Sequence, residues 1–144
     1  MQQRLTESGK GTGEEAEQYR ALAEIFGKFR SGDFSFIFNR LHEEAEQAYN
    51  TSNYQTALEK WQAGLDQARA LNIKQYISAF LGNIGLVYRK LGQYQKALEY
   101  LEQALAIMRE LGDRSGEGDA LSNLGVVYQN LGQYPRALEY HEQA

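Results

Sequence analysis

The sequence has no cysteine, a single proline and no long apolar run, and each shortage excludes something. Without cysteine the chain can form no disulfide, no thiolate zinc site and no cysteine nucleophile, which fits a reducing compartment. One proline in 144 residues leaves long stretches free of the strongest helix breaker, which favours an all-helical fold. Because no segment has the length and apolarity of a membrane span, we expect a cytoplasmic protein.

Basic residues are also in short supply. The chain has 15 lysines and arginines against 19 acidic residues, a net charge of −4, and no local basic cluster. A protein with this balance has no bulk electrostatic attraction to nucleic acid or to anionic membranes. We therefore expect neither as a partner.

What the sequence does have is an internal repeat of 40 residues, which aligns Tyr54, Tyr94 and Tyr134. Leu81–Ala104 and Leu121–Ala144 are identical at 16 of 24 positions, far above chance. A more divergent first copy begins near residue 33. The chain therefore carries three related units.

Each copy is predicted to form two helices joined by a short turn. Leu81, Ile84 and Tyr88 have the spacing of one helical stripe, and Gly92 marks the turn that follows. Pro135 falls in the expected first turn of a second helix, where proline costs little. The predicted helices are Asp33–Thr51, Tyr54–Leu71, Lys74–Leu91, Tyr94–Leu111, Ser115–Leu131 and Tyr134–Ala144.

Small residues recur where the two helices of a copy should meet. Gly85 and Ala97 of the second copy have counterparts in Gly125 and Ala137 of the third, and Ala45 takes the glycine position in the first. A bulky side chain there would push the helices apart. One such pair cannot bury its apolar stripe alone, so the pairs must stack. The prediction is an all-α, right-handed solenoid.

The predicted organisation has three parts. Residues 1–13 are polar and glycine-rich and are expected to be a disordered tail. Residues 14–32 form an N-terminal capping helix, and residues 33–144 form the array, with repeats at about 33–73, 74–113 and 114–144. The last repeat is truncated. Two explanations stay open: the chain is a piece of a longer array, or its exposed end pairs with a second molecule.

The pattern Leu81-x-x-Ile84-Gly85-x-x-Tyr88, followed by Ala97, Leu101 and Ala104, resembles the tetratricopeptide repeat consensus. The third copy matches it as well, except that His141 stands where a bulky apolar residue is usual. The spacing is similar to a long, 40-residue subclass found in Pins-type polarity adaptors and bacterial signalling proteins. The resemblance covers Asp33 to Ala144 and implies a non-catalytic module that binds other proteins.

Two short motifs could suggest chemistry, and both fail. Ser8–Gly13 lacks the first glycine and the Ser or Thr after Lys10 that a phosphate loop requires. His42 and Glu46 share a helix face, but His141 is the sole other histidine, too few for a metal site. No nucleophile and base are brought together. We expect no cofactor, no metal and no enzymatic activity.

The first helix of each copy should line the inner surface of a curved solenoid, so its outward-facing residues are candidates for contact with a peptide. In the first copy these are Asn39, His42, Glu46, Tyr49 and Asn50. In the second they are Ala79, Gly82, Asn83, Leu86, Arg89 and Lys90. In the third they are Asp119, Ser122, Asn123, Val126, Gln129 and Asn130.

Asn83 and Asn123 are notable because they recur at one register position. An amide offers both a donor and an acceptor, so it can pair with an extended peptide backbone, as similar asparagines do in related repeat proteins. The alternatives are that each asparagine joins a helix–helix hydrogen bond or that it recurs simply because the repeat was duplicated. Basic residues are missing from the places that would hold a terminal carboxylate, so carboxylate capture is not expected. The leading function is peptide or protein binding in the groove, in a segment of a larger scaffold or signalling protein; the alternative is structural self-assembly.

Overall fold

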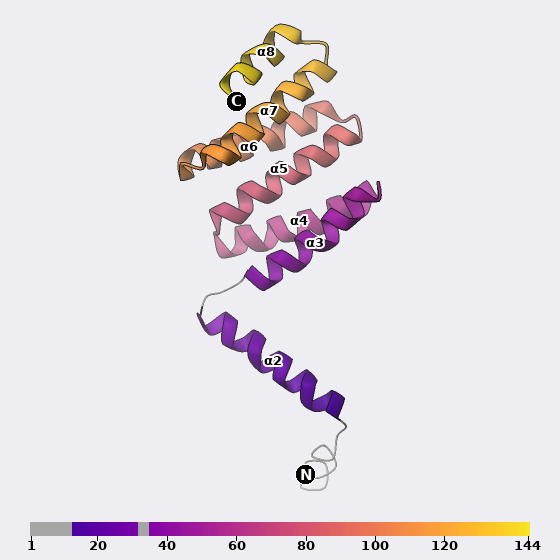
Figure 1. Cartoon of the computed structure of the whole chain (residues 1–144), viewed down its shortest axis with the longest axis vertical. Helices are drawn as coiled ribbons and strands as arrows, with labels where there is room; N and C mark the ends of the chain where they lie inside the picture. The colour runs from indigo at the N-terminus through magenta and orange to yellow at the C-terminus, as the bar shows by residue number, and fades with distance from the viewer. Residues whose placement is uncertain (1–12, 32–34) are drawn as a thin grey trace. The chain divides into compact units, whose positions relative to one another are not determined.

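The computed structural model describes residues 13–31 and 35–144, and all regular structure within these ranges is helical (Figure 1). The predicted tail, residues 1–13, lies outside the described residues except for Gly13, which begins the first helix. The helices are α2 (Gly13–Ser31), α3 (Ser35–Asn50), α4 (Tyr54–Leu71), α5 (Lys74–Lys90), α6 (Tyr94–Leu111), α7 (Arg114–Asn130) and α8 (Tyr134–Gln143). The six helices predicted for the array are confirmed to within about two residues at each end.

The chain divides into two compact units, residues 1–36 and 37–144. The first contains α2, which has Glu14 and Glu15 in its first turn, where the helix dipole favours negative charge. This segment is helical, as its apolar spacing predicted. Its role as a cap on the array stays a prediction.

The second unit is a stack of antiparallel helices in which each helix packs on the next (Figure 1). Direct contacts join α4 to α5, α5 to α6, α6 to α7 and α7 to α8, and a further contact joins α5 to α7. The last contact skips one helix, so the first helices of the second and third copies lie beside each other. The result is an α-solenoid of helix-turn-helix repeats, as predicted.

The turns between helices require a left-handed backbone at one residue each. Gly92, Gly112 and Gly132 take φ values of +73°, +68° and +75°, which glycine adopts without steric cost. At the equivalent positions of the first copy, Ser52 has φ 61° and Asn72 has φ 54°. The divergent first copy therefore keeps the turn geometry and loses the residue best suited to it.

The close approach of paired helices is confirmed at Gly85. A Cβ added to this glycine would lie 2.7 Å from Leu101 Cγ and 3.4 Å from the carbonyl oxygen of Ala97. In the third copy a Cβ on Gly125 would lie 2.7 Å from His141 Cε1. His141 therefore occupies the place of Leu101, as the repeat register predicts, although its side chain is polar.

In the second and third copies, a pair of stacked tyrosines joins the two helices. The rings of Tyr88 and Tyr100 stack at 5.4 Å, and those of Tyr128 and Tyr140 stack at 5.2 Å. Burial, with a smaller contribution from the neighbouring Tyr128, raises the pKa of Tyr140 above its ordinary value. These four tyrosines are thus packing residues.

Candidate functional site

Two crevices run between the first helices of successive copies. The first, between α3 and α5, encloses about 150 Å³ and is lined by Phe38, Asn39, His42, Tyr76, Ala79, Phe80 and Asn83. The second, between α5 and α7, encloses about 490 Å³. Its lining residues are Ala79, Gly82, Asn83, Leu86, Leu101, Met108, Asp113, Ser115, Gly116, Asp119, Ala120, Ser122 and Asn123.

The two crevices share a wall on α5. Ala79 and Asn83, one helical turn apart, line both of them. A ligand crossing α5 at this point can therefore contact both crevices. We call the two crevices together the groove.

Asn83 and Asn123 lie in the groove at equivalent places on α5 and α7, and both are half-buried. Within the described part of the chain, neither side-chain amide has a hydrogen-bond partner. The alternative role for these asparagines, a hydrogen bond between helices, is therefore absent from this structure. Their donors and acceptors remain available to a ligand.

The difference in size between the crevices follows from the repeat register. Tyr76 and Phe80 wall the first crevice, and residues 40 positions later, Gly116 and Ala120, wall the second. Replacing two aromatic rings with a hydrogen atom and a methyl group empties the space. Gly82 opens it further, because a Cβ placed there would meet nothing within 4 Å.

Aromatic packing fixes the walls of the first crevice. The Phe38 ring stacks on Tyr76 with centroids 4.2 Å apart, and it lies 5.9 Å from the Phe80 ring. Phe38 and Phe80 are fully buried. Because buried rings in such a cluster have little freedom to move, this crevice is preformed and apolar.

His42 lies at the edge of the first crevice, and a hydrogen bond from α4 fixes its side chain. Trp61 Nε1 on α4 donates a hydrogen bond to His42 Nδ1 at 3.2 Å. A ring that accepts at Nδ1 carries its proton on Nε2 when neutral, and Nε2 lies 3.8 Å from the Glu46 carboxylate. The imidazole is thus positioned by α4 rather than free to follow a ligand.

The second crevice has an acidic lining. Asp113 and Asp119 line it, and no lysine or arginine among the described residues does. Asp113 Oδ1 accepts a hydrogen bond of 3.0 Å from the backbone N–H of Gly116, which caps α7. Across residues 13–31 and 35–144, no group donates a hydrogen bond to the Asp119 carboxylate.

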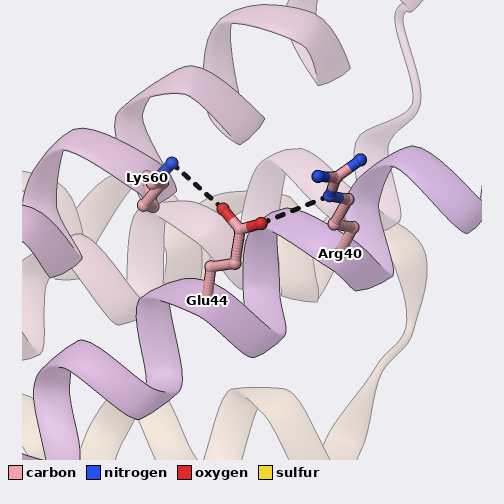
Figure 2. A network of polar contacts seen from close by, with 3 residues as sticks. All are labelled: Arg40, Glu44 and Lys60. Atoms are coloured by element: carbon pink, nitrogen blue, oxygen red, sulfur yellow. Dashed lines mark hydrogen bonds and ion pairs between the residues drawn. The ribbon is translucent and has the colours of Figure 1, made fainter.

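A charged network outside the groove joins the first two helices of the array. Figure 2 shows Glu44 between Arg40 of the same helix, at 3.2 Å, and Lys60 of α4, at 3.0 Å. The Lys60 ammonium first, and then Arg40, hold the pKa of Glu44 below its ordinary value. This glutamate lines neither crevice, so the network is a structural contact between α3 and α4.

Nine of the 17 predicted groove residues line the crevices, and eight do not. Those that do are Asn39, His42, Ala79, Gly82, Asn83, Leu86, Asp119, Ser122 and Asn123. Of the rest, Tyr49 packs its ring on Tyr54 and Trp61, and Gln129 contacts His141 Nε2 at 3.3 Å. Those that line neither crevice are Glu46, Tyr49, Asn50, Arg89, Lys90, Val126, Gln129 and Asn130.

Sequence reasoning did not single out several residues that line the crevices. Phe38, Tyr76 and Phe80 belong to the core stripes of their helices, yet one edge of each reaches the first crevice. Comparing them with their counterparts 40 residues later would have found the unequal crevices. Met108 and Asp113 come from the end of α6 and the turn after it, which the helix pattern alone does not place beside α5.

The described part of the chain contains neither a metal-binding cluster nor a membrane-spanning helix. No group of three or more histidine, aspartate and glutamate side chains in residues 13–31 and 35–144 could hold a metal ion. In the same ranges, no helix has the length and apolarity needed to cross a membrane.

The chain was compared with known proteins and structures. It matches no curated protein. Residues 76–144 match the sequence model of the tetratricopeptide repeat. The crystal structure of the TPR domain of Arabidopsis FLU superimposes with a TM-score of 0.71, covering 76% of this chain and 92% of that one at 17% identity, which shows a shared fold. Residues 76–144 therefore carry tetratricopeptide repeats, and the stacked helix pairs of the chain have the tetratricopeptide fold.

Proposed function

We propose that this protein binds an extended peptide segment of another protein in the groove. The tetratricopeptide fold is generally a protein–protein interaction module, and the groove is a surface that could accept a peptide. The observation that carries the proposal is the pair Asn83 and Asn123, which line the groove with unpaired amides at equivalent positions.

The two asparagines would hold the backbone of the peptide. Each amide can donate to a peptide carbonyl and accept from a peptide N–H, and such bonds require an extended chain. Each hydrogen bond contributes a net of about 0.5–1.5 kcal/mol, so the pair supplies a measurable part of the binding free energy but not most of it. Because the walls are packed before the ligand arrives, little affinity is lost in ordering them.

The charge distribution supports binding of an internal segment rather than of a chain terminus. A terminal carboxylate would need lysine or arginine close by, and the described residues place neither in the groove lining. We further propose that the protein acts without catalysis, in a scaffold or signalling assembly, since proteins of this family are typically non-enzymatic.

The test is the double variant Asn83→Ala and Asn123→Ala. A partner would first be captured with the full chain and identified, and its affinity for the wild type and the variant then measured by titration calorimetry. Loss of two or more hydrogen bonds should weaken binding about tenfold or more.

A matched control is Asn130→Ala, which removes an exposed asparagine of α7 that lines neither crevice. Its affinity should equal that of the wild type. If the double variant also binds as tightly as the wild type, the asparagine pair does not hold the ligand.

Self-assembly is the second candidate, and one observation favours it. Leu98 of the second copy is 8% exposed, whereas its counterpart Leu138 on α8 is 59% exposed, next to an exposed Tyr134. An apolar face of this kind could bury itself against a second copy. Sedimentation over a concentration series decides the matter: a strict monomer at the highest concentration rejects self-assembly.

A further inference from the structure

The proposed function does not say which peptides the groove prefers. The two crevices differ in size and in the charge of their lining, and these differences indicate a preference. We propose that the groove selects a segment with an apolar side chain for the first crevice and a lysine or arginine side chain, about three residues away, for the second. This inference rests on the proposed function and adds the chemistry of the partner to it.

The first crevice fits an apolar side chain by size and by lining. At about 150 Å³ it is large enough for a group the size of benzene. The buried rings of Phe38 and Phe80 lie beneath its walls, and the partly exposed ring of Tyr76 forms part of them, so the crevice favours a hydrocarbon group over a charge. Leucine, isoleucine, methionine or phenylalanine therefore suits this position.

The second crevice fits a basic side chain by charge. Its two charged lining residues are Asp113 and Asp119, and the Asp119 carboxylate has no donor among the described residues. Two basic residues of the surrounding helix ends are already engaged, since Arg109 pairs with Glu117 at 2.9 Å and Lys74 pairs with Glu110, and Arg114 at the start of α7 does not line the crevice. A cation from a ligand would supply the missing partner.

The size of the second crevice also suits a lysine or arginine side chain. Its volume of about 490 Å³ accommodates a long, flexible side chain whose methylene stem lies along apolar groups while its charged head reaches a carboxylate. Leu86 and Met108 supply such apolar groups, and Gly82 leaves the entrance clear. A short acidic or polar side chain would leave most of the space to water.

The spacing of the two side chains follows from helix packing. The crevices lie on either side of α5, so their centres are separated by about the distance between the axes of two packed helices, roughly 8–10 Å. An extended peptide advances about 3.3 Å per residue. The apolar and basic residues should thus be about three positions apart.

The experiment is a selection from a phage-displayed library of random linear peptides, using the full chain as bait. Peptides that carry the apolar and basic pair at this spacing should be enriched. The variant Asp119→Lys should reverse the preference, enriching aspartate or glutamate at the basic position. It should bind the peptides selected by the wild type about tenfold more weakly or worse.

Asp66→Lys is the matched control, because it makes the same charge change on α4 at an exposed residue outside the groove. It should select the same peptides as the wild type. Circular dichroism would confirm that each variant keeps its helix content.

The outcomes separate the two proposals. If enriched peptides lose affinity for the Asn83→Ala, Asn123→Ala variant but lack the apolar and basic pair, or if Asp119→Lys selects the same sequences, the preference inferred here is wrong and groove binding stands. If no peptide is enriched over bait-free beads, or if the asparagine variant binds the enriched peptides unchanged, peptide binding in the groove is itself wrong, and the inference falls with it.

Discussion

Two glycines of α5, three residues apart, should respond in opposite ways to the same substitution. A Cβ at Gly82 would meet nothing within 4 Å, whereas one at Gly85 would lie 2.7 Å from Leu101 Cγ. Alanine favours the helix over glycine by about 1 kcal/mol at either site. At Gly82 that gain is unopposed, so Gly82→Ala should raise the free energy of unfolding by about 1 kcal/mol.

At Gly85 the same gain is opposed by overpacking. Leu101 is 0% exposed, so its side chain cannot swing into solvent to make room. Forcing an extra methyl group into a packed interior costs about 1–3 kcal/mol. Because the helix-propensity term is common to both variants, it cancels in the comparison. Gly85→Ala should therefore be less stable than Gly82→Ala by about 1–3 kcal/mol.

The assay is urea denaturation followed by far-UV circular dichroism and by fluorescence of Trp61, with coincident curves as the check on cooperative unfolding. Gly125→Ala is an internal control. There the Cβ would meet His141, which is exposed near the end of α8 and can turn aside, so its cost should be smaller. Equal unfolding midpoints for Gly82→Ala and Gly85→Ala would refute the argument that helix pairs are held together at Gly85.

Three further outcomes follow from the fold. Ser52→Gly should stabilise the protein by about 1 kcal/mol in the same denaturation assay, because serine at φ 61° is strained; an unchanged midpoint would count against strain in this turn. Leu98→Ala should cost about 2–5 kcal/mol and Leu138→Ala about 0.5 kcal/mol or less, since the first is buried and the second exposed; similar losses would contradict this packing. Because its folded pKa is lowered, Glu44 contributes stability above the ordinary glutamate pKa and loses it as pH falls through the lowered value. The midpoint difference between wild type and Glu44→Gln should therefore shrink on acidification, and a difference independent of pH would argue against the network.

The sequence was informative about the helices because the repeat supplied several independent copies of one pattern. The bounds of α4 and α6 agree with the prediction residue for residue, since Asn72 and Gly112 end these helices with a left-handed residue. The residues predicted to face inward agree less closely with the lining of the crevices. Tyr49 points at Trp61 of its own pair and Gln129 at His141, and helix periodicity does not distinguish such directions from the inward face.

By itself, the sequence determined the fold. Its signals are apolar stripes of helical period, small residues at the helix contacts and glycines at the turns. Each of these depends on the residues of one short segment and not on distant contacts. It also drew attention to Asn83 and Asn123, whose binding role stays a prediction, because a polar residue recurring at one register position can be seen without coordinates. Only the tertiary structure decided the shape of the groove. The two crevices depend on which side chains from four helices and one turn meet across copies. Their unequal size arises because Gly116 and Ala120 stand where the first crevice has Tyr76 and Phe80.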